Sequence, residues 1–297
     1  MKKVLWAVFL LGFAAAMSAA EKAPLKVYVS ADMEGIWGIV HAEQTSPSGP
    51  DYGQARKWMA HDVNAVVAGL FEAGATEVIV NDSHGGMRNI LAEDLDPRAG
   101  LISGTPKPLV MMEGIDATFA ACVFVGYHAR AGTANSVLDH TISSGTVRAF
   151  KVNGTELPEL GINGAIAGYY KVPVVMLSGD AETCAQARAI LGNEIVTVAV
   201  KEGVGRTAAK MLPQDEARRL LKEGAKQALA KRDKVVPFKL TPPLNFELEF
   251  LNSLQAELPS LLPQVKRVSA RSVAFTSSDY LEGFKLARAV IALAGIQ

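Results

Sequence analysis

The sequence predicts an α/β fold built on a mixed, mostly parallel sheet. Apolar runs rich in β-branched residues alternate with helical patterns, as in the successive segments 25–31, 54–73 and 77–81. This βαβ rhythm favours parallel neighbouring strands. The dipeptide Asn153-Gly154 is a strong hairpin signal, so part of the sheet near it is expected to be antiparallel.

The helix predicted over 54–73 is amphipathic, and its apolar residues recur on one face: Trp58, Met59, Val63, Val66, Val67 and Leu70. Gly74 follows at the position where a glycine commonly ends a helix. Further strands are expected over 101–103, 121–126, 147–152, 172–177 and 195–200, with helices near 108–114, 161–169 and 181–191.

The last third of the chain has a different pattern. It predicts a charged helix over 213–232, a proline-marked segment over 236–243, strands over 245–250 and 265–275, and a helix over 278–293. Because no Gly/Ser-rich linker separates these parts, residues 21–297 are predicted to form one domain. Its main sheet unit would span 21–200, and a C-terminal α+β extension would span 201–297.

Composition excludes some classes of partner. The 297 residues are 49% hydrophobic and 20% charged, which allows a large core. Thirty basic residues balance thirty acidic ones, so no overall field would attract nucleic acid or an anionic membrane. The basic residues between 218 and 232 lack the interleaved aromatics that stack bases, and a solvated helix face is expected there.

The first twenty residues are predicted to be a secretory signal peptide. Lys2 and Lys3 precede the apolar stretch 4–16, and small residues lead up to Ala20. This stretch is shorter than the roughly 20 residues of a membrane span, so cleavage near Ala20 is favoured over a retained anchor, which stays the alternative. The mature chain is therefore expected in the periplasm or outside the cell, with no stable membrane anchor.

Export would place the chain in an oxidising compartment, yet it contains only Cys122 and Cys184. Each cysteine lies in an apolar or helix-like segment. Buried free thiols are the favoured interpretation, because free cysteine commonly behaves as a small hydrophobic residue. A disulfide between the two stays open.

Five oxygen or imidazole side chains lie close to the ends of short apolar runs: Asp32, Glu34, His84, His128 and Glu159. The carboxyl ends of parallel strands converge on one crevice, where such residues can meet around an ion. Nitrogen and oxygen ligands without thiolate suit catalytic zinc, manganese or iron better than structural zinc. Five ligands exceed the usual three of one catalytic zinc, and two metals with a bridging carboxylate would use them all.

Four of these residues also have a simpler interpretation. Asp32 and Glu34 would face the same side of a strand, where two carboxylates repel unless a cation, a shared proton or solvent relieves them. A solvated strand end would satisfy them without metal. His84 lies in a glycine-containing turn after a strand and could bond only to local backbone, and Glu159 could cap a helix.

His140 follows in the segment LDHT, beyond a polar loop. Its surroundings suit proton transfer at neutral pH, so it is a candidate acid, base or nucleophile rather than a ligand. A solvated loop histidine is the alternative.

Five motifs in order resemble the zinc D-aminopeptidases of the DppA type: SADMEGI, VNDSHGGM, GYHARAGT, ELGINGAIAGYY and SGD. The resemblance runs from about Lys26 to near the C-terminus. It implies a three-layer α/β/α fold, two zinc ions per subunit and removal of N-terminal, preferably D-, residues from short peptides. It also implies a ring-based homo-oligomer, with a decamer as one size.

By motif, the resemblance implies Asp32 as the bridging carboxylate, Glu34 as a terminal ligand, and His84, His128 and Glu159 as the remaining ligands. It implies His140 as the catalytic histidine. General acid/base catalysis with a metal-activated water is preferred, and direct attack by His140 stays open. The chain departs from the family in its export signal, in a slightly longer loop between His128 and His140, and in Asp139, where a small hydroxyl residue is expected.

The sequence therefore predicts an exported, metal-dependent aminopeptidase acting on short peptides. Two alternatives remain. The same metals could serve an amidase or esterase acting on a non-peptide substrate, or the chain could be a periplasmic peptide-binding or transport accessory protein.

Overall fold

The larger sheet carries seven strands in the order β3-β2-β1-β4-β7-β8-β9. All neighbours are parallel except β9, which pairs antiparallel with β8. The strands are β1 (Lys26–Ala31), β2 (Glu77–Asp82), β3 (Gly100–Ile102), β4 (Ala121–Val125), β7 (Val174–Asp180), β8 (Val196–Gly205) and β9 (Ala208–Met211). This computed structural model describes residues 24–296, so the signal peptide expected over 1–20 lies outside the described residues.

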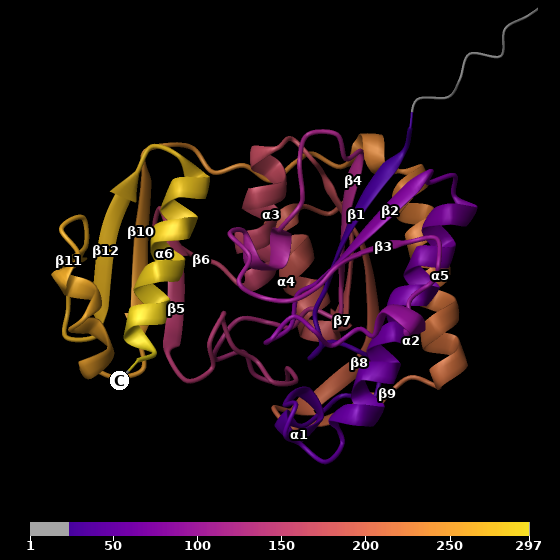
Figure 1. Cartoon of the computed structure of the whole chain (residues 1–297), viewed down its shortest axis with the longest axis horizontal. Coiled ribbons are helices and arrows are strands. Elements are labelled where there is room, and N and C mark those ends of the chain that lie inside the picture. The colour runs from indigo at the N-terminus through magenta and orange to yellow at the C-terminus, as the bar shows by residue number, and fades with distance from the viewer. Residues whose placement is uncertain (1–23, 297) are drawn as a thin grey trace, which may run out of the picture.

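Helices cover both faces of this sheet, as Figure 1 shows. One face packs against α2 (Tyr52–Glu72) and α5 (Gln214–Ala230), and the other against α3 (Glu159–Tyr169) and α4 (Ala181–Leu191). The alternation of β1 explains both cores, because Val27 and Val29 face α2 while Tyr28 faces the opposite core. The predicted three-layer α/β/α fold with a mixed, mostly parallel sheet is confirmed.

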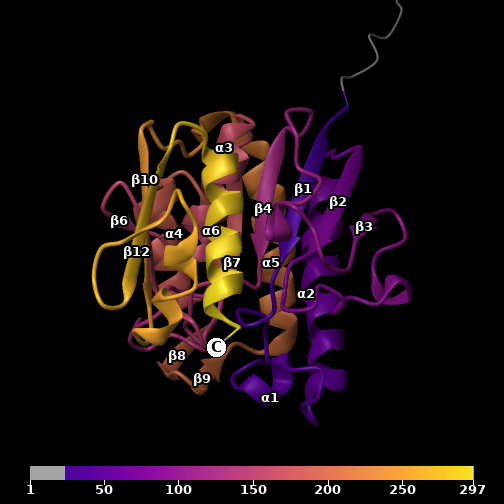
Figure 2. The same ribbon diagram turned by 60° about the vertical axis from the view of Figure 1, so that its left-hand side comes forward.

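A second, antiparallel sheet lies beside α3 and α4 (Figures 1 and 2). Its order is β11-β12-β10-β5-β6, and α6 (Tyr280–Ala294) packs on it through contacts with β10 and β12. The strands are β5 (Val147–Val152), β6 (Thr155–Glu156), β10 (Leu244–Phe250), β11 (Lys266–Arg267) and β12 (Ser272–Ser277). The hairpin expected at Asn153-Gly154 joins β5 to β6, and both turn residues have positive φ.

The boundary expected at residue 200 does not separate the two sheets. The strand β5 pairs with β10, almost a hundred residues later, while β9 and α5 belong to the main sheet unit. The reason is long-range pairing, which local patterns do not reveal.

Two elements also differ from expectation. Residues 108–114 form only a short 3₁₀ turn, because Val110 has a φ of 51°, and the strand expected over 265–275 is a hairpin of β11 and β12.

The remaining elements are short. They are α1 (Ala42–Thr45) and the 3₁₀ turns Ala92–Asp94, Val110–Met112, Arg232–Lys234, Leu254–Ala256 and Pro259–Leu261. Cys122 and Cys184 are both buried and free, as the favoured interpretation expects. Within residues 24–296, every helix is too short or too polar to span a bilayer.

The order of strands in the main sheet places a crevice between β1 and β4. From β1 the chain moves outward to β2 and β3 on one side, and it then returns to β4 on the other side. The connections leaving β1 and β4 therefore diverge at their carboxyl ends. Ligands of open α/β sheets bind at such a switch point.

Candidate metal centre

Asp32 and Glu34 follow β1 at the switch point, and both are at least 95% buried. The backbone N–H of Asp32 donates to the carbonyl of Val125, and the N–H of Gly35 donates to the carbonyl of Gly126, each over 2.8 Å. These bonds fasten the segment after β1 to the segment after β4. The two carboxylates are thereby brought next to His128.

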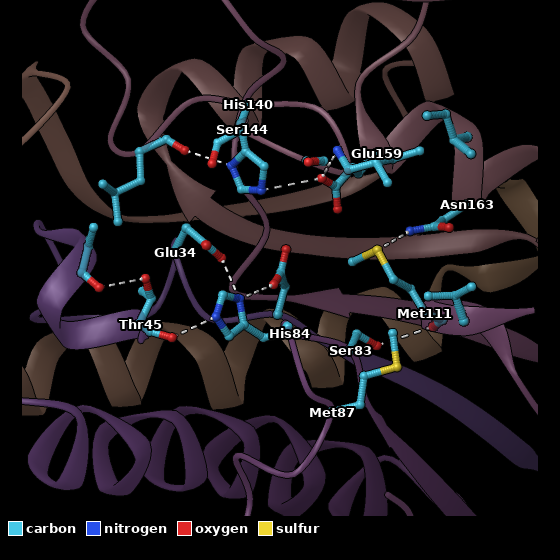
Figure 3. Close-up of a pocket in the computed structure, with 18 of the residues that line it drawn as sticks. Glu34, Thr45, Ser83, His84, Met87, Met111, His140, Ser144, Glu159 and Asn163 are labelled. Carbon is cyan, nitrogen blue, oxygen red and sulfur yellow. Dashed lines mark hydrogen bonds and ion pairs between the residues drawn. The ribbon is translucent and has the colours of Figure 1, made fainter. Parts of the chain in front are cut away.

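His84 follows β2 and faces both carboxylates. Its Nδ1 lies 3.1 Å from Glu34 Oε2 (Figure 3). The same nitrogen lies 3.3 Å from Asp32 Oδ1. Its Nε2 lies 2.9 Å from the carbonyl oxygen of Thr45 in α1. Because only a protonated Nε2 can donate to that carbonyl, the ring presents Nδ1 to the site, as the orienting partners of metal-bound histidines do.

His128 follows β4 and is fully enclosed. Its Nδ1 is 3.0 Å from the carbonyl oxygen of Ala129, and its Nε2 faces Asp32 Oδ2 at 3.5 Å and Glu159 Oε1 at 3.3 Å. The arrangement matches that of His84: one ring nitrogen contacts a backbone carbonyl and the other faces carboxylates. Asp32 thus directs one oxygen to each histidine.

Glu159 is the first residue of α3. Its carboxylate does not cap this helix. Instead, Oε1 accepts a hydrogen bond from the backbone N–H of Ile142 over 2.6 Å and faces His128. The interpretation of Glu159 as a simple helix cap is therefore wrong.

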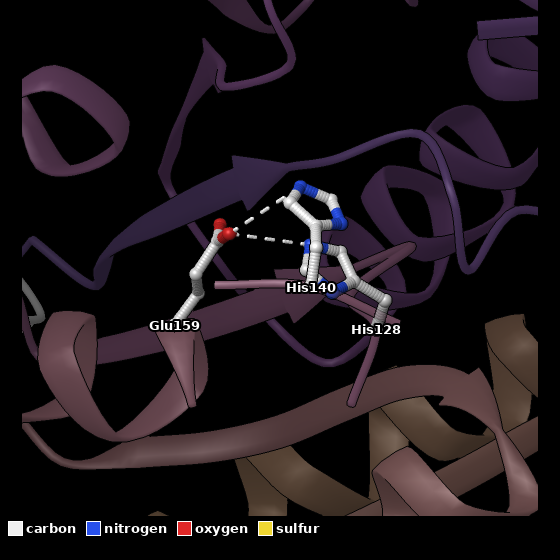
Figure 4. Close-up of side chains that lie close together, drawn as sticks. All are labelled: His128, His140 and Glu159. Carbon is white, nitrogen blue, oxygen red and sulfur yellow. Dashed lines mark ion pairs between the residues drawn. The ribbon is translucent and has the colours of Figure 1, made fainter. Parts of the chain in front are cut away.

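His140 lies in the loop between β4 and β5, with its ring stacked on that of His128 at a centroid distance of 3.9 Å (Figure 4). Its Nδ1 is 2.9 Å from the carbonyl oxygen of Leu138, and its Nε2 is 3.7 Å from Glu159 Oε1. The alternative of a solvated loop histidine is wrong. The structure thus brings together all five predicted ligands and the predicted catalytic histidine.

Two aspartate carboxylates anchor the loop that carries His140. Asp180, from the SGD motif, accepts hydrogen bonds from Ser136 Oγ and the Val137 N–H, each over 2.7 Å. Asp139 accepts from the N–H groups of Gly132 and Thr133. Asp139 therefore folds the loop back on itself.

The donor set fits a divalent metal. Asp32, Glu34 and His128 offer ligand atoms within 4.8 Å of one another, as do His128, His140 and Glu159. Among the described residues, Asp32 Oδ2 is a buried carboxylate oxygen without a hydrogen-bond partner. Such an atom is costly to bury unless a cation compensates it. Nitrogen and oxygen donors without thiolate are those of catalytic zinc sites.

Burial and the charges of neighbouring side chains shift the pKa values of the cluster when no metal is bound. Burial, together with the charge of Glu34, raises the pKa of Asp32 to about 7. Burial would lower the pKa of His128, but the carboxylates of Glu159 and Asp32 outweigh it and raise this pKa to about 10. Burial and the nearby His128 lower the pKa of His140. His140 is thus the neutral imidazole of the cluster near pH 7.

A cavity of about 460 Å³ opens over the cluster, within the usual size range of small-molecule sites. Besides the cluster, its lining includes Phe284 and Arg288 of α6 and Arg206.

The sequence patterns did not predict a role for two residues of this region. Arg288 lies in an amphipathic helix, where an arginine is an ordinary residue. Lys201 gave only the weak signal of a lysine in a β-branched strand, yet its ammonium lies buried against the 34–39 segment.

Comparisons with known proteins agree with this architecture. The family model of peptidase family M55, described as D-aminopeptidase, matches residues 25–289. A D-aminopeptidase of Bacillus subtilis (strain 168) is 41% identical over 264 residues, which cover 88% of this chain and 94% of that protein. The solved structure of the Zn-dependent D-aminopeptidase DppA from Bacillus subtilis, described as a self-compartmentalizing protease, superposes with a TM-score of 0.89. It is 39% identical, and the match covers 92% of this chain and 99% of that one. Since fold and sequence agree along nearly the whole described chain, the protein is a hydrolase that belongs to the M55 family of D-aminopeptidases.

Proposed function

We propose that this chain is an exported aminopeptidase that uses two zinc ions to remove N-terminal residues, preferably D-amino acids, from short peptides. The observation that carries the proposal is the orientation of Asp32, whose two oxygens face His84 and His128 separately. A carboxylate placed in this way suits a bridge between two cations. The zinc dependence stated for the Bacillus subtilis DppA supports zinc as the metal.

The contacts support a division of the proposed ligands between the two sides of Asp32. His84 and Glu34 would hold one ion with it, and His128 and Glu159 would hold the other. Bound zinc would lower the pKa of a water molecule and polarise the scissile carbonyl. The chain's own contribution is to fix these donors on the ends of rigid strands and the start of α3, so that little reorganisation is needed.

His140 is the proposed general acid/base. Its Nδ1–H donates to the Leu138 carbonyl, which leaves the lone pair of Nε2 facing the site. Because its pKa is lowered, the ring is neutral at pH 7 and can accept a proton from the attacking water. The same nitrogen can then return the proton to the leaving amine.

The location and assembly of the chain are part of the proposal. The charged start, apolar core and small residues of positions 1–20 support export and cleavage near Ala20. The self-compartmentalizing description of DppA supports a ring-based homo-oligomer, with a decamer as one size. Mass measurement of the protein isolated from cell fractions would locate the cleavage site and the compartment. Light scattering would give the number of subunits, and a monomer would contradict the assembly.

The central test combines metal content with turnover. Elemental analysis of the purified mature chain should find close to two zinc ions per subunit, and the same sample should cleave D-Ala-D-Ala faster than L-Ala-L-Ala. Two ions without cleavage of either peptide would overturn the peptidase assignment in favour of another amide or ester. A protein that takes up no zinc would overturn the proposed mechanism.

A further inference from the structure

Arg288 of α6 stands where two cavities meet. Its side chain lines the cavity over the metal cluster and also a neighbouring cavity of about 320 Å³. Gly85, Met87 and Val110 line both cavities as well. A molecule that extends from the cluster toward the smaller cavity would therefore pass the guanidinium of Arg288.

This guanidinium differs from the other cations of the two cavities. Arg206 pairs with Asp139 at 3.1 Å, Lys107 donates to the Asp82 carbonyl at 2.7 Å, and Lys285 pairs with Glu282 at 2.9 Å. Within residues 24–296, Arg288 makes neither an ion pair nor a hydrogen bond, although its side chain is partly buried. It is thus a partly desolvated cation with five N–H donors available to a ligand.

Charge is distributed unevenly along the two cavities. The carboxylates in the lining of the larger one are Asp32, Glu34 and Glu159, all in the metal cluster. The lining of the smaller cavity contains three cations, Lys107, Lys285 and Arg288, and no aspartate or glutamate. The anionic end of an elongated ligand is therefore favoured on the side of Arg288 and the smaller cavity.

We propose that Arg288 binds the C-terminal carboxylate of the substrate, so that the site selects peptides short enough to reach it while their N-terminal residue lies at the metal cluster. This inference rests on the proposed aminopeptidase function. A guanidinium binds a carboxylate through two parallel hydrogen bonds, which fixes orientation as well as position. Short peptides with a free C-terminal carboxylate are the substrate class that follows.

The experiment compares a dipeptide with its amide. Zinc-loaded wild type should cleave D-Ala-D-Ala with a kcat/KM about 10- to 100-fold above that for D-Ala-D-Ala amide, as expected for a charged hydrogen-bonded contact. Arg288→Leu should lose this factor on the free acid, mainly through KM, and should affect the amide far less. Arg288→Lys should retain part of the preference. The control Arg219→Leu removes an exposed arginine paired with Glu216 on α5, and it should change neither substrate.

The outcomes separate this inference from the function on which it rests. Equal rates on acid and amide in wild type, or equal losses on both in Arg288→Leu, would overturn the role of Arg288 while the aminopeptidase stands. If wild type cleaves neither peptide, the proposed function fails, and calorimetric titration with the same two peptides decides the role of Arg288. Tighter binding of the acid that Arg288→Leu abolishes would support it, and equal binding would overturn it. If the leucine variant does not fold, the wild-type preference and the lysine variant still decide.

Discussion

The ammonium of Lys201 donates a hydrogen bond of 2.6 Å to the backbone carbonyl of Glu34. It donates two more, to the carbonyls of Ile36 at 2.8 Å and Ile39 at 2.6 Å. Lys201 is 1% exposed, so all three bonds lie inside the protein. A residue of β8 thereby fixes the segment that carries two candidate ligands.

Replacing Lys201 by Met keeps the length of the side chain and removes its donors. Three buried carbonyls would then lose the donor that Lys201 supplies, and we expect the free energy of unfolding to fall by about 2 to 4 kcal/mol. We also expect zinc affinity to fall by about 10- to 100-fold, as for other residues that orient ligands. Urea unfolding and zinc titration measure the two effects. Lys210→Met, at an exposed position of β9, is the matched control. Unchanged zinc affinity in the folded Lys201 variant would show that the segment keeps its shape without the lysine.

Metal binding should release protons, because the metal-free cluster holds them. The pKa of His128 is raised to about 10, so its ring is protonated at pH 7 and must lose a proton before it can ligate. Affinity for zinc should therefore rise with pH from 7 toward 10. Calorimetry at pH 7 in two buffers of different ionisation enthalpy counts the released protons. His128→Gln should release fewer protons than wild type, and a wild-type heat independent of buffer would contradict the expected protonation.

Local sequence patterns could predict those elements whose formation depends on residues close together in the chain. The bounds of α4 agree with the expected 181–191, because apolar periodicity and the cap at Asp180 both act within a few residues. The pairing of β5 with β10 joins segments about a hundred residues apart, and the sequence of neither strand indicates which strand it pairs with. The sequence therefore predicted both strands but placed β5 in the wrong sheet.

The candidate site shows the same division. His84 and His128 were found because each follows an apolar strand, and parallel strands end at a common edge. Lys201 was missed because its importance comes from three carbonyls more than 160 residues earlier in the chain. The roles of the six predicted residues as ligands or catalyst stay predictions.

His140 is expected to act in proton transfer and not in metal binding. His140→Asn should therefore keep the full zinc content and lose about 10²- to 10⁴-fold in kcat. His84→Ala should instead lose zinc. Elemental analysis and D-Ala-D-Ala kinetics on the same samples distinguish the two. Because His140 Nε2 lies 3.7 Å from Glu159, its role as a ligand is the rival, and loss of zinc in His140→Asn would establish that rival.

The contact between Gly35 and Gly126 should control how the two halves of the cluster meet. A Cβ at Gly35 would overlap the backbone carbonyls of Tyr127 and Gly126, which follow β4. Since backbone cannot yield as a flexible side chain does, Gly35→Ala must push apart the segments that carry Asp32 and His128. We expect a loss of about 3 kcal/mol in the free energy of unfolding, with weaker zinc binding in whatever folds.

Gly53 is the matched control for this substitution. A Cβ there meets no atom within 4 Å, and the residue lies in α2, where alanine is favoured over glycine. Gly53→Ala should leave zinc affinity unchanged and stabilise the protein by about 0.5 kcal/mol. Chemical denaturation and zinc titration of both variants give the comparison. If Gly35→Ala matched Gly53→Ala in both measurements, the close approach of the two segments would not be what holds Asp32 against His128.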